Sequence, residues 1–228
     1  MPGSPQRRQK AIERKSAKRK EKKRALAKMP GEREPTSQRG TVRAAAHWSL
    51  HEVLISEGWN QTAELPGLTQ VLVARRSPHG EVGMASFLVD LGCLGVKNAM
   101  GKVFSFEGEY AQAVRRIEAA TQRLVPVNLD LAAKVVQEGI AYARSLGFQP
   151  HRDYFVVAPF LEGAHPEACP TKIPLGYQGK PFYASGPYDN PKKIVDKLAK
   201  TVGVGNFDYV VEVSPSELVI DADELNTD

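Results

Sequence analysis

The stretch QVLVARRSPHGEVGMASFLVDL (residues 70–91) contains two apolar segments, 70–76 and 82–91, separated by the residues PHGE at 78–81. Both segments are rich in valine and other aliphatic side chains, which favour strands. Two such segments joined by a short connection with proline and glycine indicate a β-hairpin. The sequence therefore predicts an antiparallel strand pair, and the rest of the fold can be built outward from it.

Further strands are expected on both sides of this hairpin. WSLHEVLI (48–55) predicts a strand, with a helix beginning in the alanine run at 44–46 as the alternative. VFSF (103–106) predicts a short strand, and FDYVVEV (207–213) predicts a closing one. Segment 153–161 is ambiguous because Pro159 interrupts it.

Helices are predicted in the middle and near the end of the chain. Residues 109–124 carry apolar side chains on one face, and residues 128–148 follow with Asn128 as N-cap and Gly147 at the C-terminal stop. A third helix covers 192–203, after Asn190 as N-cap and Pro191 at the first helical position. Because strands and helices do not alternate regularly, the pattern predicts a single α+β domain around an antiparallel or mixed sheet.

Charge divides the 228-residue chain into unlike parts. Residues 1–43 contain 15 Lys or Arg and 4 Glu, whereas residues 44–228 contain 16 Lys or Arg and 22 Asp or Glu. The segment 30–40, PGEREPTSQRG, has the composition of a linker. We therefore expect a basic arm and linker at 1–43, a globular domain at 44–213 and an acidic tail at 214–228.

The basic arm, RRQKAIERKSAKRKEKKRALAK (7–28), holds twelve cations and two Glu, a formal charge of +10. Its helix propensity is high, but Ile12 and Leu26 cannot form an apolar stripe, so we expect it to be disordered or a fraying helix when free. Nucleic acid is the expected partner, because such an arm binds phosphates with counterion release. The residues expected to do so are Arg7, Arg8, Lys10, Arg14, Lys15, Lys18, Arg19, Lys20, Lys22, Lys23, Arg24 and Lys28.

Other partners are weighed against nucleic acid. Interfacial helices need an apolar face that the arm lacks, so no membrane partner is expected. A solvated tail without a dedicated partner is the open alternative. RNA is favoured over DNA because the arm resembles the Lys/Arg/Ala-rich extensions of ribosomal proteins, which implies rRNA and the ribosome as partners. A protein partner of the globular domain is also possible.

Weak candidates for catalysis lie in FLVDLGCLGVKN (87–98). Asp90 near a strand end and Lys97 in the following segment suggest a metal-dependent nuclease or a nucleotide-acting enzyme, with the arm as tether. The second acid that such a site needs is absent beside Lys97, and the structural alternative is that Asp90 bonds backbone amides. No nucleotide-binding or hydrolase motif is present, so whether the chain is an enzyme stays open, leaning to no.

A possible surface site lies in GYQGKPFYASGPYDNP (176–191). Aromatic side chains and one lysine could contact nucleotides or a protein, although turns at Gln178-Gly179 and Gly186-Pro187 explain most of the same residues. The candidates are Tyr177, Lys180, Phe182, Tyr183 and Tyr188.

No cofactor or metal site is predicted. His165 and Glu167 lack the paired cysteines of a zinc deaminase, and His47 and His51 lack a third ligand. With two cysteines and no signal-like apolar segment, the sequence predicts a reduced, cytoplasmic protein.

Three blocks, VLVARRSPHGEVGMASFLVDLGCLGVKNA, LAAKVVQEGIAYARSLGFQPHRDY and CPTKIPLGYQGKPFYASGPYDNPKK, resemble a family of uncharacterised bacterial proteins. The family shares VLVAR...FLVDLxCLGVK and GKPFY..GPYD blocks, often after a lysine-rich N-terminus. The resemblance covers about residues 47–213. It implies a bacterial, cytoplasmic protein and assigns no catalytic role to Asp90, Lys97 or Lys180.

Overall fold

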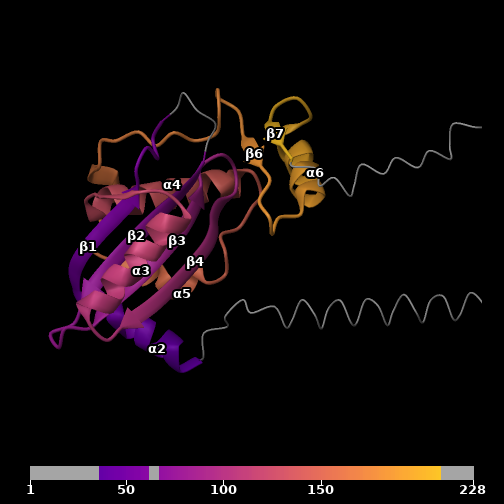
Figure 1. Cartoon of the computed structure of the whole chain (residues 1–228). Helices are drawn as coiled ribbons and strands as arrows, with labels where there is room; N and C mark the ends of the chain where they lie inside the picture. The colour runs from indigo at the N-terminus through magenta and orange to yellow at the C-terminus, as the bar shows by residue number, and fades with distance from the viewer. Residues whose placement is uncertain (1–35, 62–66, 212–228) are drawn as a thin grey trace, which may run out of the picture. The chain divides into compact units, whose positions relative to one another are not determined.

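The computed structural model describes residues 36–61 and 67–211, which form an antiparallel sheet with packed helices. The sheet has the strand order β4-β3-β2-β1-β5, and Figure 1 shows β4 to β1 side by side. Its strands are β1 (Ser49–Ser56), β2 (Leu68–Arg76), β3 (Val82–Asp90), β4 (Gly95–Phe104) and β5 (Leu124–Pro126). The predicted α+β class is confirmed. The basic arm (7–28) and the acidic tail (214–228) lie outside the described residues.

The predicted hairpin is the centre of this sheet. β2 and β3 pair without a register shift from Leu68 opposite Asp90 to Arg76 opposite Val82. The turn closes with the Ser77 amide donating to the Glu81 carbonyl at 2.9 Å. Gly80 has a φ of 91°, which a residue with a side chain adopts only with strain.

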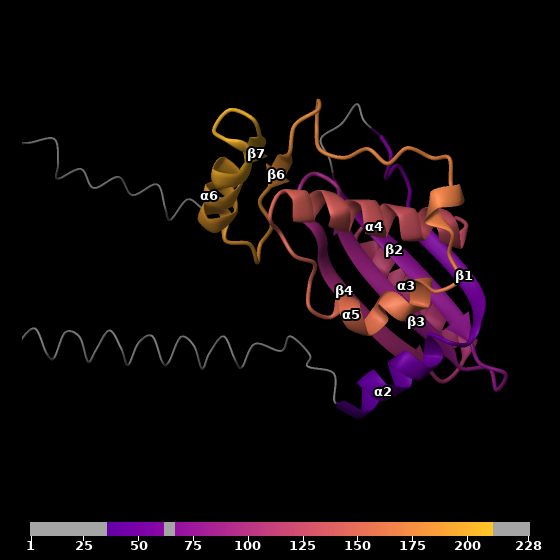
Figure 2. The same cartoon turned by 180° about the vertical axis from the view of Figure 1, so that it is seen from behind.

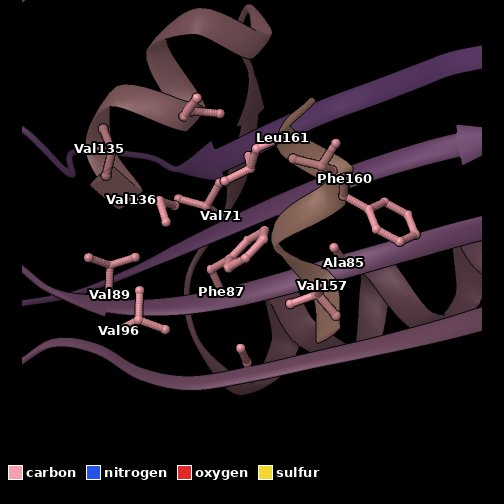
Figure 3. Packing of buried hydrophobic residues seen from close by; sticks show 14 of the residues in the cluster. Val71, Ala85, Phe87, Val89, Val96, Val135, Val136, Val157, Phe160 and Leu161 are labelled. Carbon is pink, nitrogen blue, oxygen red and sulfur yellow. The ribbon is translucent and has the colours of Figure 1, made fainter. Parts of the chain in front are cut away.

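Both faces of the sheet are covered by helices. Val71, Val73 and Phe87 point to one face, where α4 (Leu129–Ser145), α5 (Tyr154–Val157) and the 3₁₀ turn η1 (Ala158–Leu161) pack (Figures 2 and 3). Leu72 and Met84 point to the other face, where α3 (Glu107–Ala120) packs. Burial on both faces explains why the central strands are nearly continuous apolar runs.

The helix α2 (Thr36–Ala45) precedes the first strand. The alanine run therefore ends a helix, and the predicted strand begins only at Ser49. Val42 is 1% exposed, and a Cβ atom on Gly101 would lie 2.4 Å from its Cγ1 atom. Because Val42 packs into the space that this glycine leaves, α2 belongs to the folded domain and crosses the predicted boundary at residue 43.

The sequence located the middle helices but not all of their ends. The Asn128 side chain accepts a hydrogen bond from the Leu131 amide at 2.8 Å, and Gly147 has a φ of 85°, as expected of residues that begin and end α4. α3 stops at Ala120, four residues earlier than predicted. Leu124 joins β5 because its pairing with β1 buries it. The ambiguous segment 153–161 forms α5 and η1.

The C-terminal part of the domain is a small β-α-β unit. It consists of β6 (Phe182–Ala184), α6 (Pro191–Val202) and β7 (Asp208–Val210), with β6 and β7 paired in parallel. Asn190 caps α6 by accepting from the Lys193 amide at 3.0 Å, as predicted. Its core combines Tyr183 and Leu198 with Cys93 from the β3–β4 connection. This unit is therefore joined to the main sheet by shared packing.

Candidate functional site

A β-bulge in β4 positions Lys97. Asn98 lies opposite Leu88 and Val96 lies opposite Val89, so Lys97 is the extra residue on its strand. Bulges redirect a side chain and often occur at functional positions. Lys97 was expected in the glycine-containing segment after the strand of Asp90, and the structure shows that it lies in β4, which pairs with β3 back to Gly95.

Asp189 is the partner of Lys97, and the sequence analysis did not identify it. The Lys97 ammonium lies 2.8 Å from Asp189 Oδ2. The same oxygen accepts hydrogen bonds from the Tyr183 hydroxyl at 3.2 Å and from the Gly186 amide at 2.8 Å. The side chains of Lys97 and Asp189 are only 15% and 12% exposed, so this is a largely buried ion pair between the bulge and the turn before α6.

Asp90 ends β3 and faces the backbone of the following loop. Its Oδ1 atom accepts a hydrogen bond from the Cys93 amide at 3.0 Å. Burial raises the pKa of this carboxyl, and the hydrogen bond from Cys93 and the charge of Lys97 act against that shift. Asp90 therefore bonds a backbone amide, as the structural alternative predicted.

Burial and negative charge also act on the neighbouring groups. Desolvation, with Asp90 as the next cause, raises the pKa of the Cys93 thiol. Desolvation and the charge of Asp189 raise the pKa of Tyr183, and desolvation raises the pKa of Tyr142 to about 12. These three groups therefore stay protonated at neutral pH, and none of them is activated as a nucleophile or base.

Glycines allow the segment after residue 175 to lie against the Asp90 loop. The Gly176 amide donates to the Leu91 carbonyl at 2.9 Å, and the Phe182 amide donates to the Gly92 carbonyl at 3.0 Å. A Cβ atom on Gly92 would lie 2.4 Å from the Phe182 carbonyl oxygen. The absence of side chains thus permits the backbone contact that brings Tyr183 and Asp189 to Lys97.

The five candidates of the possible surface site do not share one surface. Phe182 and Tyr183 are buried, because β6 turns them into the domain, whereas Tyr188 is 99% exposed. Lys180 donates to the Gly205 carbonyl at 3.0 Å. Tyr177 pairs with Lys180 across the predicted Gln178-Gly179 turn.

A pocket of about 820 Å³ lies beside this cluster and includes Tyr177 in its lining. Trp59 supplies a second aromatic side chain, and Arg123 and Lys172 supply two cations. Glu57 is the acidic residue among the described residues of the lining, and its Oε1 atom lies 3.6 Å from an Arg123 guanidinium nitrogen. Neither Asp90 nor Lys97 lines this pocket.

Amide side chains complete the polar lining. They come from three separate segments of the chain: Asn60, Gln61, Gln122 and Gln178. The sequence alone did not indicate a role for Trp59, Arg123 or Lys172, nor for these amides. A tryptophan in the polar sequence SEGWNQ was the one local signal, since large aromatic residues are uncommon in loops of that composition.

Neither a metal site nor a membrane-spanning helix is found in the described part of the chain. Within residues 36–61 and 67–211, no group of three His, Cys, Asp or Glu side chains could hold a metal ion. In the same part of the chain, no helix is both long and apolar enough to cross a bilayer.

No family model matches the sequence, and comparisons with curated proteins and with solved structures gave no significant match.

Proposed function

We propose that the protein binds RNA through contacts between its basic arm and the phosphate backbone, and that ribosomal RNA is the target. One observation carries the proposal: residues 7–28 hold a formal charge of +10, whereas residues 44–228 have six more acidic than basic residues. The net negative charge of the domain disfavours a long polyanion such as RNA, so the arm is where RNA binds. The arm has no aromatic residue, and its binding should not depend on sequence.

The geometry around Asp90 and Lys97 favours binding over the alternative of a metal-dependent nuclease. Such an enzyme needs carboxylates and a lysine that face a cleft. Asp90 instead faces the Cys93 amide, and Lys97 is held by Asp189. The two side chains therefore stabilise the fold of the globular domain.

The test compares full-length variants that differ only in the charge of the arm. Lys18, Lys20, Lys22 and Lys23 are replaced by glutamine in one variant and by arginine in the other. RNA affinity is measured by filter binding over a range of salt concentrations. Each phosphate contact contributes about 0.7 to the slope of log affinity against log salt for single strands, so the glutamine variant should lose about 3 in slope.

The arginine variant is the matched control and should keep the slope of the unmodified protein. Co-sedimentation with ribosomes at low and high salt then tests the proposed target. An unchanged slope in the glutamine variant would refute the role of the arm. Salt-dependent binding to free RNA without co-sedimentation would refute the ribosome as the target and leave RNA binding intact.

A further inference from the structure

We infer that the pocket lined by Trp59, Tyr177, Arg123 and Lys172 binds a single nucleotide unit, by stacking its base and pairing its phosphate with a cation. The choice of a nucleotide among anionic ligands rests on the proposed RNA-binding function. The pocket has a lining whose named residues all belong to the globular domain. Its volume, about 820 Å³, is within the range of pockets that enclose small molecules.

The two aromatic residues are held in place before any ligand binds. Trp59 packs against the main core, and its amide donates to the Ser56 carbonyl at 3.3 Å. Tyr177 exchanges two backbone hydrogen bonds with Lys180 and meets the Phe182 ring edge to face at 5.7 Å. Fixed aromatic rings suit stacking of a flat base, because little conformational freedom is lost on binding.

The polar lining fits the edges of a base. Amide side chains offer donors and acceptors together, which is what the Watson–Crick edge of any base needs. Gln122 lines the pocket with its amide group, whose Nε2 atom donates a long hydrogen bond to the Leu68 carbonyl at 3.4 Å. Asn60, Gln61 and Gln178 are exposed residues of the same lining.

Charge distinguishes a nucleotide from a neutral ligand such as a sugar. Glu57 lies close enough to Arg123 to offset that cation. Lys172 is exposed and has no carboxylate partner within the described ranges 36–61 and 67–211. Among the described lining residues, Lys172 is therefore a cation without a carboxylate partner, which suits a phosphate group next to the stacked base.

The test uses Trp59 as its own reporter. The chain has two tryptophans, so Trp48→Phe in the full-length protein leaves Trp59 as the single one. Each of the four ribonucleoside monophosphates is titrated, with the free nucleosides and ribose phosphate as comparisons. N-acetyltryptophanamide corrects for absorption by the bases. We expect saturable quenching by at least one monophosphate, about tenfold weaker binding of its nucleoside, and no quenching by ribose phosphate.

Lys172→Ala should weaken the monophosphate about tenfold and leave the nucleoside unchanged. Lys193→Ala, an exposed lysine on α6 outside the pocket lining, is the matched control and should change neither. The inference is overturned if no monophosphate quenches Trp59 saturably, if ribose phosphate quenches equally, or if Lys172→Ala has no effect on the monophosphate.

These outcomes are separable from those of the arm experiment. A monophosphate reports on the pocket alone, whereas the salt slope of RNA binding reports on the arm. If no monophosphate quenches Trp59 and the salt slope of RNA binding depends on the arm, this inference is refuted and the proposed function is kept. Saturable quenching of Trp59, together with a salt slope of RNA binding that is the same in the glutamine variant, supports this inference and refutes the proposed role of the arm.

Discussion

Replacing Asp189 by asparagine should destabilise the domain strongly although the two side chains have nearly the same shape. The change removes the negative charge that neutralises Lys97 at 2.8 Å and weakens the acceptor of the Tyr183 hydroxyl and the Gly186 amide. Removing one partner of a buried ion pair costs about 3–5 kcal/mol, because the other charge is left uncompensated. Lys97 is 15% exposed, so we expect the lower end, about 3 kcal/mol.

Urea denaturation followed by circular dichroism measures this loss. The midpoint should fall while the dependence of the unfolding free energy on urea stays the same, because the buried area is unchanged. For a domain of this size, 3 kcal/mol corresponds to a decrease of about 6–12 °C in Tm. Asp196→Asn, at an exposed position in α6, is the matched control and should lie within about 0.5 kcal/mol of the unmodified protein.

A double-mutant cycle isolates the pair itself. Lys97→Met alone should also destabilise, and Lys97→Met combined with Asp189→Asn should cost at least about 1.5 kcal/mol less than the sum of the single changes. Additive losses would show that the two charges do not stabilise each other. A loss below about 0.5 kcal/mol for Asp189→Asn would refute the assignment of a buried ion pair altogether.

Three further outcomes are expected. Gly101→Ala should cost about 1–3 kcal/mol in urea denaturation because its Cβ atom would overlap Val42, and adding Val42→Ala should restore part of the loss; a further decrease would contradict the docking of α2. Burial raises the pKa of Asp90, so the stability that this carboxyl contributes is present at low pH and is lost as the pH rises through its folded pKa. The unfolding free energy of the unmodified protein should therefore decrease relative to Asp90→Asn from about pH 4 upward, whereas parallel pH profiles would contradict it. Cys93 and Cys169 are both buried, so a thiol reagent should modify them slowly in the folded protein and completely in denaturant; rapid modification of the folded protein would be inconsistent with this packing.

Local signals in the sequence were sufficient for the parts of the fold that depend on neighbouring residues. The β2–β3 hairpin follows from two valine-rich runs around one turn, and the N-caps Asn128 and Asn190 mark their helices within a residue. β4 was predicted too short because GVKNAMGK has few strand-forming residues. Its strand conformation comes from pairing with β3 rather than from its own propensity.

The candidate site was harder to predict because its members are distant in sequence. Lys97 and Asp189 are separated by 92 positions, and nothing in the turn sequence GPYDNP shows that its aspartate faces a lysine. Tyr183 was a candidate for a surface site because its segment combines aromatic residues with a lysine, yet β6 buries it completely. The pocket combines residues 57–61 and 67–69 with Leu91 and with the distant segments 122–123 and 172–179, and only tertiary structure brings these together.

The late position of Asp189 in the chain has a consequence for biosynthesis. Domains are made from the N-terminus onward, so the β1–β4 meander can pair while the residues after η2 (Pro166–Ala168) are still being added. A product that stops before residue 183 keeps Lys97 without its counter-charge and leaves Cys93 and Leu94 without the cover of Tyr183 and Leu198. Truncated chains would thus expose apolar surface and unfold more readily than the full-length protein. Proteases would degrade them for that reason.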